Sequence, residues 1–530
     1  MTQHALLRTG TRCLLVQTEF SAMSFWNYVE VCKIVGAKYP APPLGLLTAA
    51  ALLPQDWEFM LVDTNVGPLL DEHLQWADVV CTGGMLPQQK AMLALIERAH
   101  RHQLPVVVGG PDPSSQPDLY AAADYLVRGE GEVTIPLFVA DLERGATHGN
   151  YVSEERADMA CAVVPRFDLI RFRDYMQVGI QYSRGCPYNC EFCDIIELYG
   201  RASRTKMPEQ IIRELQALHD LGYRGHIDFV DDNFIGNKRN VLQVLPAIKE
   251  WSQDHGFPFF FSTEAAITLA EDETLMQMMK DVDFRFVFIG IETPSAEVLK
   301  AINKRQNMRK SIVDAVRKIG SYGMIVNAGF IVGFDDEGEH TATQMIECIQ
   351  DAGICMAMVG KLSALPNTQL TRRLQAEGRL FGDGRTISCG GGEIDQLTSG
   401  LNFLTARPRL DVLRDFRQVI EHIYNPRNYY ARTLRTELGL DFHKKYRPSF
   451  RDKLRRGVSF AKVARKAGFN RSTGWLFWKT MATVAVRNHR GMEGAVNLAA
   501  MFVHFRGQAQ YIIDLTEQEI RRLERVTAAA

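Results

Sequence analysis

The stretch Cys186-Pro187-Tyr188-Asn189-Cys190-Glu191-Phe192-Cys193 places three thiols within eight residues. At this C-x₃-C-x₂-C spacing, one tight loop can point three sulfur atoms at a single centre. Zinc sites usually take four protein ligands and pair their thiols, and the sequence has no second pair and no nearby His. A 4Fe–4S cluster is normally held by four thiolates, so three would leave one iron open to a small molecule. The pattern favours such a cluster, and the alternative is three buried or zinc-bound cysteines.

The composition is that of a large globular protein. The chain has 530 residues, 46% apolar and 23% charged, with a formal net charge of −1, so two to four domains are expected. Its ten cysteines do not form the pattern of a disulfide framework. The N-terminus has no apolar signal core, and no long uncharged apolar window predicts a membrane span. These features predict a reduced, cytoplasmic setting.

Strands and helices alternate over residues 1–142, which predicts an α/β domain with a doubly wound parallel sheet, a Rossmann-like fold. Ligands of such sheets lie at the carboxyl ends of the strands, and glycine there permits close approach of the backbone. On pattern alone, a ligand-free domain remains the alternative. The candidate ligand-binding residues are Asp63, Asn65, Gly83, Gly109 and Gly110, and a further Gly-rich loop is 129–132. The expected strands are 12–17, 58–63, 77–81 and 105–110, with helices at 46–53 and 88–102.

Residues 143–175 are predicted to be a linker, and the alternation resumes over residues 176–384. Six strand–helix units are expected there, too few to close an eight-stranded barrel. The three-cysteine loop follows the first of these strands, at the end where barrels of this kind carry their active sites. The expected strands are 178–183, 225–231, 258–264, 284–291, 324–333 and 357–363, with helices at 208–221 and 314–322.

Acidic residues end the next predicted strands. Asp231-Asp232-Asn233 ends the second strand, Glu264 the third and Glu292 the fourth. A carboxylate at such a position can accept hydrogen bonds from an ammonium group or from ribose hydroxyls. A solvated turn is the alternative for the Asp-Asp-Asn run, but its place at a strand end favours a role in the site.

Residues 385–530 are predicted to form a mainly helical, basic C-terminal region. Between residues 427 and 490 stand 17 Lys and Arg against 3 Asp and Glu, interleaved with aromatic residues such as Trp475 and Trp478. Such a run attracts anionic lipid, nucleic acid or acidic substrates. The alternative is a basic face packed against the acidic remainder of the chain. No recognised nucleic-acid-binding module is present, so nucleic acid is not expected as a partner.

The order of parts, a Rossmann-like domain and then the three-cysteine loop, resembles the cobalamin-binding (class B) radical S-adenosylmethionine family. Segments 42–47 and 61–65 look like the N-terminal half of that family. Segments 194–201 and 230–237 resemble the branch of the hopanoid C-2 methylase and the bacteriochlorophyll side-chain methylases. The resemblance covers roughly residues 12–510.

One departure from related cobalamin domains concerns the cobalt ligand. Domains of the methionine synthase type carry D-x-H-x-x-G after the first strand, and the His ligates cobalt. Here that place reads Gln17-Thr18-Glu19-Phe20-Ser21-Ala22, without a His. The departure is usual in the radical family, so cobalamin is still expected, with the lower face of the cobalt unassigned.

The resemblance implies an open partial (β/α)₆ barrel and three cofactors: a 4Fe–4S cluster, S-adenosyl-L-methionine and cobalamin. Cys186, Cys190 and Cys193 would ligate the cluster, whose open iron would bind S-adenosylmethionine. No catalytic side chain is assigned. The residues implied to contact S-adenosylmethionine are Glu264, Glu292, Gly329, Ile331, Gly333 and Pro366, of which the glycines and Ile331 form the family's G-x-I-x-G segment beside the adenine.

The implied reaction is methylation of an unactivated carbon of a large apolar substrate, a lipid or tetrapyrrole-like molecule, through a 5′-deoxyadenosyl radical and methylcobalamin. An sp³ carbon is no nucleophile, so polar methylation would fail. The implied partners are an electron donor such as flavodoxin or ferredoxin and an anionic membrane, contacted peripherally at its inner face. The alternatives are a cobalamin-dependent radical cyclase or oxidoreductase without methyl transfer, a radical enzyme with an empty Rossmann-like domain, and a non-enzymatic iron–sulfur scaffold.

Overall fold

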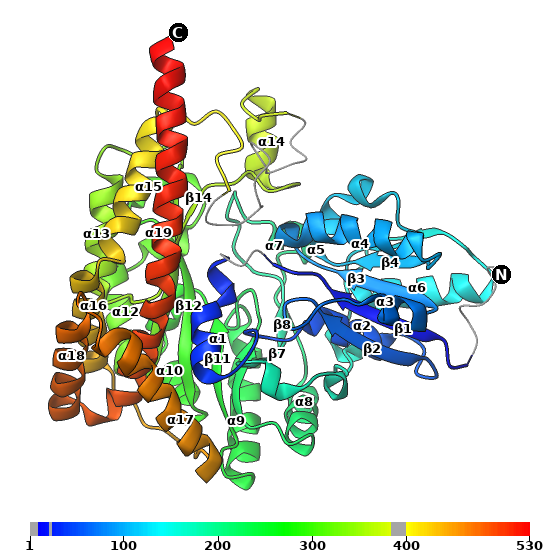
Figure 1. The fold of residues 1–530 in the computed structure, drawn as a ribbon, viewed down its shortest axis with the longest axis horizontal. Helices are drawn as coiled ribbons and strands as arrows, with labels where there is room; N and C mark the ends of the chain where they lie inside the picture. The colour runs from blue at the N-terminus through cyan, green and yellow to red at the C-terminus, as the bar shows by residue number, and fades with distance from the viewer. Residues whose placement is uncertain (1–8, 21–23, 383–398, 530) are drawn as a thin grey trace.

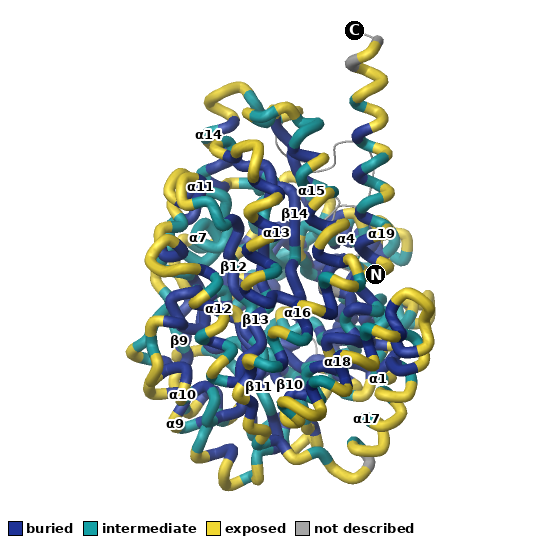
Figure 2. Tube along the Cα trace, turned by 90° about the vertical axis from the view of Figure 1, so that its left-hand side faces the viewer, coloured by how far each residue is buried: buried dark blue, intermediate teal, exposed yellow. Residues whose placement is uncertain are grey.

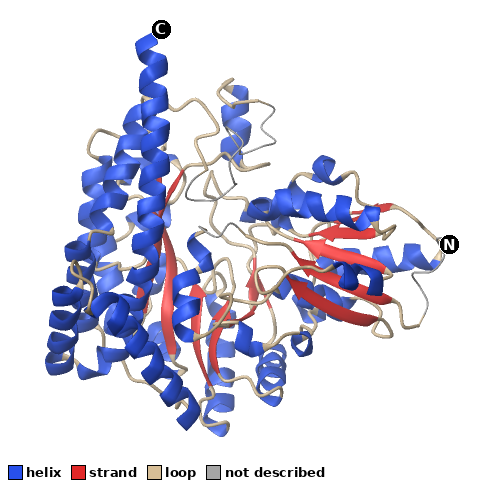
Figure 3. Ribbon diagram, viewed as in Figure 1, coloured by secondary structure: helices blue, strands red, loops and turns tan. Residues whose placement is uncertain are grey.

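The computed structural model describes residues 9–20, 24–382 and 399–529. It contains two six-stranded sheets and a largely helical C-terminal region (Figure 1). The strands of both sheets lie inside and helices lie outside (Figure 3). The predicted fold class, a Rossmann-like domain, a partial barrel and a helical C-terminal region, is confirmed.

The first sheet has the strand order β2-β1-β3-β4-β5-β6, and all of its neighbouring strands are parallel. Alternate side chains of β1 face opposite sides: Cys13 and Leu15 pack toward α2 and α6, whereas Leu14 and Val16 pack toward α3 and α4. Helices therefore cover both faces, as a buried parallel sheet requires. The elements are β1 (Arg12–Gln17), α2 (Leu44–Leu52), β2 (Glu58–Asp63), α3 (Asp71–Trp76), β3 (Val79–Gly83), α4 (Gln89–Arg101), β4 (Val106–Gly109), β5 (Tyr125–Val127), α6 (Gly131–Glu143) and β6 (Gly149–Tyr151). Strand β6 lies in the segment that the sequence predicted to be a linker.

The second sheet runs β7-β10-β11-β12-β13-β14 in chain order, again with parallel neighbours. Its end strands β7 and β14 do not pair with each other, so the barrel stays open on one side. The strands are β7 (Val178–Ile180), β10 (Gly225–Phe229), β11 (Phe259–Glu264), β12 (Phe284–Glu292), β13 (Ile325–Val332) and β14 (Ala357–Lys361). The helices between and after them are α8 (Pro208–Asp220), α9 (Lys238–Asp254), α10 (Glu273–Asp281), α11 (Ala296–Ala301), α12 (Ile312–Ser321), α13 (Thr341–Ala352) and α14 (Gln369–Ala376).

The first predicted barrel strand, 178–183, is shorter in the structure. It ends at Ile180, and the chain then forms a short antiparallel ribbon from β8 (Ser183–Arg184) and β9 (Arg204–Thr205). The three-cysteine loop and the short helix α7 (Ile195–Leu198) lie between the two strands of this ribbon. The ribbon therefore fixes both ends of the loop.

The C-terminal helices and one N-terminal helix share a core with the barrel. Helix α1 (Val29–Val35) packs against α17 and α19, and its side chains Val31 and Ile34 join the large core that contains the barrel (Figure 1). The buried barrel strands and the exposed C-terminal end of α19 are seen in Figure 2. None of the described helices is both long and apolar enough to cross a membrane. The C-terminal helices are α15 (Arg409–Ile423), α16 (Pro426–Gly439), α17 (Phe450–Val463), α18 (Gly474–Arg487) and α19 (Met492–Ala529).

Candidate functional site

A cavity of about 1990 Å³ lies between the first sheet, the three-cysteine loop and the barrel interior, and α1, α17 and the start of α19 also line it. Pockets for one small ligand usually have about 300–1,000 Å³, so this space has room for more than one molecule. It reaches the carboxyl ends of both sheets, where open α/β sheets and barrels bind their ligands.

The three-cysteine loop borders this cavity through Phe192, Cys193 and Asp194. Two amide side chains from outside the loop approach its sulfur atoms. Asn233 Nδ2 lies 3.8 Å from Cys186 Sγ, and Gln306 Nε2 lies 3.8 Å from Cys190 Sγ. Hydrogen bonds of this kind stabilise thiolates and tune the potential of iron–sulfur clusters.

A buried lysine adds positive charge next to the loop. Lys304 Nζ forms an ion pair of 2.5 Å with Glu292. Burial lowers the pKa of Lys304, but the charges of Glu292 and Cys190 outweigh burial and leave this pKa raised. Glu292 itself has φ +64°, which is unfavourable for a residue other than Gly and is typical of constrained functional positions.

The donor set of the loop fits a three-thiolate cluster. In the described part of the chain, no three Cys, His, Asp or Glu side chains are already gathered closely enough to hold a metal ion. The loop nevertheless supplies three thiols, and Asn233, Gln306 and Lys304 direct donors or charge toward them. Burial raises the pKa of Cys186 and of Cys193, so a bound cation is needed to keep these groups as thiolates.

The Asp-Asp-Asn run anchors the loop through its backbone. Asp231 accepts hydrogen bonds from the N–H groups of Tyr182 and Ser183, and Asp232 accepts one of 3.1 Å from Gly185. Burial raises the pKa of Asp231 to about 7 and that of Asp232 to about 6. The run is therefore not a solvated turn, because it holds the chain that enters the cysteine loop.

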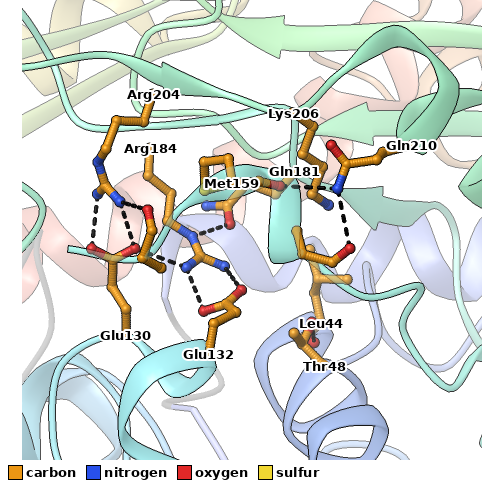
Figure 4. Close-up of polar contacts among 12 residues, drawn as sticks. Leu44, Thr48, Glu130, Glu132, Met159, Gln181, Arg184, Arg204, Lys206 and Gln210 are labelled. Carbon is orange, nitrogen blue, oxygen red and sulfur yellow. Dashed lines mark hydrogen bonds and ion pairs between the residues drawn. The ribbon is translucent and has the colours of Figure 1, made fainter.

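A buried cluster of ion pairs joins the N-terminal domain to the ribbon (Figure 4). Arg184 contacts Glu130 at 3.0 Å and both oxygens of Glu132 at 2.7 Å. Arg204 contacts the two oxygens of Glu130 at 2.8 and 2.9 Å. The Glu130 side chain is 1% exposed. The Gly-rich loop 129–132 thus binds the base of the cysteine loop.

The predicted S-adenosylmethionine residues divide into two groups. Glu264, Ile331 and Pro366 line the cavity, whereas Glu292, Gly329 and Gly333 are not among its lining residues. Burial, with the charge of Asp228 next in importance, raises the pKa of Glu264 to about 8. A Cβ on Gly329 would lie 3.2 Å from the Phe288 ring, and one on Gly333 would lie 2.6 Å from Leu401. These two glycines therefore allow close packing around the site.

The predicted cobalamin residues shape the loops of the first sheet but do not line the cavity. Asp63 accepts hydrogen bonds from Asn65 and from the Tyr175 hydroxyl at 3.0 Å. A Cβ on Gly83 would lie 2.8 Å from the Gly109 carbonyl oxygen, and one on Gly110 would lie 2.8 Å from the amide nitrogen of Gly84, so the loops cross closely there. The side chains that reach the cavity from the loops after β3 and β4 are Met85, Leu86, Pro87, Pro111, Asp112 and Ser115.

This part of the cavity offers a mainly apolar surface to a large cofactor and no imidazole ligand from the same domain. Four of the six side chains just named are apolar and come from the carboxyl ends of β3 and β4. Among the cavity-lining residues described between 9 and 142, none is a His. The segment after β1 has no His, and the other described cavity-lining residues of the N-terminal domain supply none either.

Three family models match successive parts of the chain. A "B12 binding domain" model matches residues 33–139, and a "Radical SAM superfamily" model matches residues 180–349. A "Domain of unknown function (DUF4070)" model matches residues 368–518.

Two relatives are similar over most of the chain. An uncharacterized methyltransferase of Synechocystis sp. is 40% identical over 93% of this chain and 91% of its own length. The hopanoid C-2 methylase of Rhodopseudomonas palustris is 39% identical over 73% of this chain and 71% of its own length.

Two solved structures share the fold. The cobalamin-dependent S-adenosylmethionine radical enzyme OxsB, with aqua-cobalamin bound, has a TM-score of 0.60 at 14% identity and covers 97% of this chain and 81% of its own. The radical S-adenosylmethionine methyltransferase TsrM of Kitasatospora setae has a TM-score of 0.61 at 14% identity, covering 87% of this chain and 100% of its own.

Proposed function

The chain belongs to the cobalamin-binding branch of the radical S-adenosylmethionine superfamily and is a C-methyltransferase, and from this premise we propose that it methylates an unactivated carbon of a large, mainly apolar substrate bound inside the barrel. The observation that carries the proposal is the single cavity that connects the first sheet, the cysteine loop and the barrel interior. Both cofactor regions and a substrate can share such a space.

We propose that Cys186, Cys190 and Cys193 hold the 4Fe–4S cluster. When bound, the cluster, S-adenosylmethionine and cobalamin supply the radical and methyl chemistry that a protein side chain lacks. The chain's own groups bind and orient: Asn233 and Gln306 direct N–H groups at the sulfur atoms. Glu264, Ile331 and Pro366 would contact S-adenosylmethionine, since they line the cavity. A reductant is needed, and a flavodoxin or ferredoxin is the proposed donor.

The proposed substrate class rests on the character of the barrel interior. Phe286, Phe288, Ile325 and Met358 line the cavity from β12, β13 and β14, and burial of apolar surface stabilises binding by about 25 cal/mol per Å². A strain that lacks the gene should accumulate a lipid or tetrapyrrole-like molecule lacking one methyl group. Mass spectrometry of organic extracts from the two strains tests this expectation, and identical extracts from both strains would contradict it.

We also propose a peripheral contact with anionic membranes, centred on α17. Phe450, Leu454 and Val458 stand four residues apart along this helix and are 82%, 64% and 51% exposed. Lys453 and Arg455 lie between them and form no ion pair with a described residue. An apolar stripe flanked by basic residues is typical of a helix that lies in a membrane interface.

The basic run of the sequence contributes less to this surface than its charge suggests. Lys444 and Arg456 pair with Glu493, Lys445 approaches Asp281 at 3.8 Å, and Lys466 pairs with Glu30. Part of the run therefore faces carboxylates of the same chain, as the alternative interpretation of the sequence predicted.

The protein should bind anionic liposomes at low salt and neutral liposomes much less. The double variant Lys453→Glu/Leu454→Asp should lose most of this binding, because each basic residue near an anionic surface contributes about 1 kcal/mol and the apolar stripe loses its centre. Flotation with the matched variant Leu242→Asp, at an exposed leucine of α9, provides the control. Equal flotation of both variants, or no preference for anionic lipid, would contradict the proposal.

A further inference from the structure

The barrel interior has two unlike walls. Gln177, His226, Asp228 and Ser262 line the cavity from β10, β11 and the residue before β7; we call them the polar wall. Asp228 and Ser262 are paired neighbours in the sheet, as are His226 and Phe260. The apolar wall consists of Phe286, Phe288, Ile325 and Met358 on β12, β13 and β14, and it begins beside the polar wall, since Phe286 pairs with Ser262 in the sheet.

A directed chain of hydrogen bonds runs through the polar wall. The Ser262 hydroxyl donates to Asp228, and His226 Nε2 lies 2.7 Å from Ser262 Oγ. Since the only hydroxyl proton of Ser262 goes to Asp228, the shared proton between His226 and Ser262 must come from Nε2. Burial lowers the pKa of His226 to about 3, so the ring is neutral and its Nδ1 is an acceptor.

The position of the His226 ring is fixed. It stacks on Phe260 with a centroid distance of 4.8 Å and an interplanar angle of 10°. Gln177 Nε2 reaches Asp228 only at 3.4 Å, which is a weak contact for a carboxylate. Among the described residues, no cation forms an ion pair with Asp228.

The four side chains of the polar wall thus contain more hydrogen-bond acceptors than donors. Asn327 of β13 also lines the cavity, and its buried amide oxygen has no hydrogen-bond partner among the described residues. Buried polar groups in native proteins normally have partners. A ligand group that donates hydrogen bonds would supply what these acceptors lack, while the rest of the ligand contacts the apolar wall.

We propose that Gln177, His226, Asp228 and Ser262 form a binding subsite for a hydroxyl group carried by an otherwise apolar substrate. The subsite rests on the proposed function and adds a specific polar feature to the substrate class. A hydroxyl suits the wall better than an ammonium group, because it can donate to Asp228 or His226 Nδ1 and accept from Gln177 Nε2.

The subsite lies deeper in the barrel than the cysteine loop, and this position determines how a bound substrate is oriented. Ser262 lies two residues before Glu264, which ends β11, so it lies roughly 7 Å deeper in the barrel than the strand ends. The cysteine loop lies at the strand ends. A hydroxyl bound by the polar wall is therefore remote from the reacting carbon and fixes which part of the substrate faces the cofactors.

The test uses the purified holoenzyme, S-adenosylmethionine with a deuterated methyl group, and the chloroform–methanol extract of a strain that lacks the gene. The labelled product should carry a free hydroxyl group. Chemical acetylation should therefore convert it into an acetate ester, which mass spectrometry detects as the mass of one added acetyl group. Ser262→Ala and Asp228→Asn should raise the apparent KM for the extract component about tenfold or more, with a smaller change in kcat. Ser262→Thr keeps the hydroxyl and should restore most of the binding.

The matched control is Ser252→Ala on α9, which deletes a buried serine hydroxyl outside the cavity that has no hydrogen-bond partner in the described part of the chain. Its KM should equal that of the wild type. A labelled product without a hydroxyl, or an unchanged KM in Ser262→Ala and Asp228→Asn, would overturn the subsite alone. No labelled product from the wild type would overturn the proposed function and the subsite with it.

Discussion

Replacing Cys190 by Ala should reduce bound iron to background and abolish formation of 5′-deoxyadenosine from S-adenosylmethionine. Cys190 is buried and receives an N–H contact from Gln306. Two remaining thiolates cannot hold a cluster that already has one site without a protein ligand. Anaerobic reconstitution, iron and sulfide analysis, and chromatography of the reduced reaction mixture measure both effects.

The matched control for this variant is Cys161→Ala, which removes an exposed thiol outside the cysteine loop. It should keep the iron content and the cleavage rate of the parent protein. If Cys190→Ala produced 5′-deoxyadenosine at the rate of Cys161→Ala, the assignment of the cluster to this loop would be wrong.

Glu130→Ala should weaken both the domain contact and the cysteine loop. The change leaves Arg204 without a carboxylate partner and Arg184 with Glu132 alone. These ion pairs are buried, since the Glu130 side chain is only 1% exposed. Breaking a buried pair by removing one partner costs about 3–5 kcal/mol. We expect a lower unfolding midpoint in denaturant and a lower iron content after reconstitution, because Arg184 and Arg204 stand at the two ends of the loop.

Glu273→Ala provides the comparison, since it removes one partner of the exposed ion pair between Glu273 and Lys318. Exposed pairs contribute little to stability, so this variant should unfold and bind iron like the parent. Equal midpoints for Glu130→Ala and Glu273→Ala would show that the contact between the domains does not support the loop.

The sequence predicted most elements because their apolar periodicity is strong. The barrel strand expected at 284–291 is β12 (Phe284–Glu292), and the helix expected at 208–221 is α8 (Pro208–Asp220). The prediction of a site role for the Asp-Asp-Asn run also has a structural basis, since Asn233 reaches Cys186 and both aspartates hold the loop backbone.

Long-range packing could not be predicted in the same way. The apolar face of α1 could pack against any apolar surface. Its own sequence does not indicate that it packs against α17 and α19 rather than against the first sheet. Glu130 and Arg184 are 54 residues apart, so no spacing rule joins them. The polar wall was missed because alternating residues such as His226 and Asp228 look like the solvent face of a strand, whereas here that face lines an internal cavity.

The central claim is that this chain transfers a methyl group from S-adenosylmethionine to a carbon of its substrate with the help of cobalamin. The most direct measurement is mass spectrometry of a reduced, anaerobic reaction that contains S-adenosylmethionine with a deuterated methyl group and the extract of a strain lacking the gene. We expect 5′-deoxyadenosine together with a product that has gained one deuterated methyl group, and no such methylated product without added or bound cobalamin. A product that is cyclised or oxidised but carries no deuterated methyl group would contradict it.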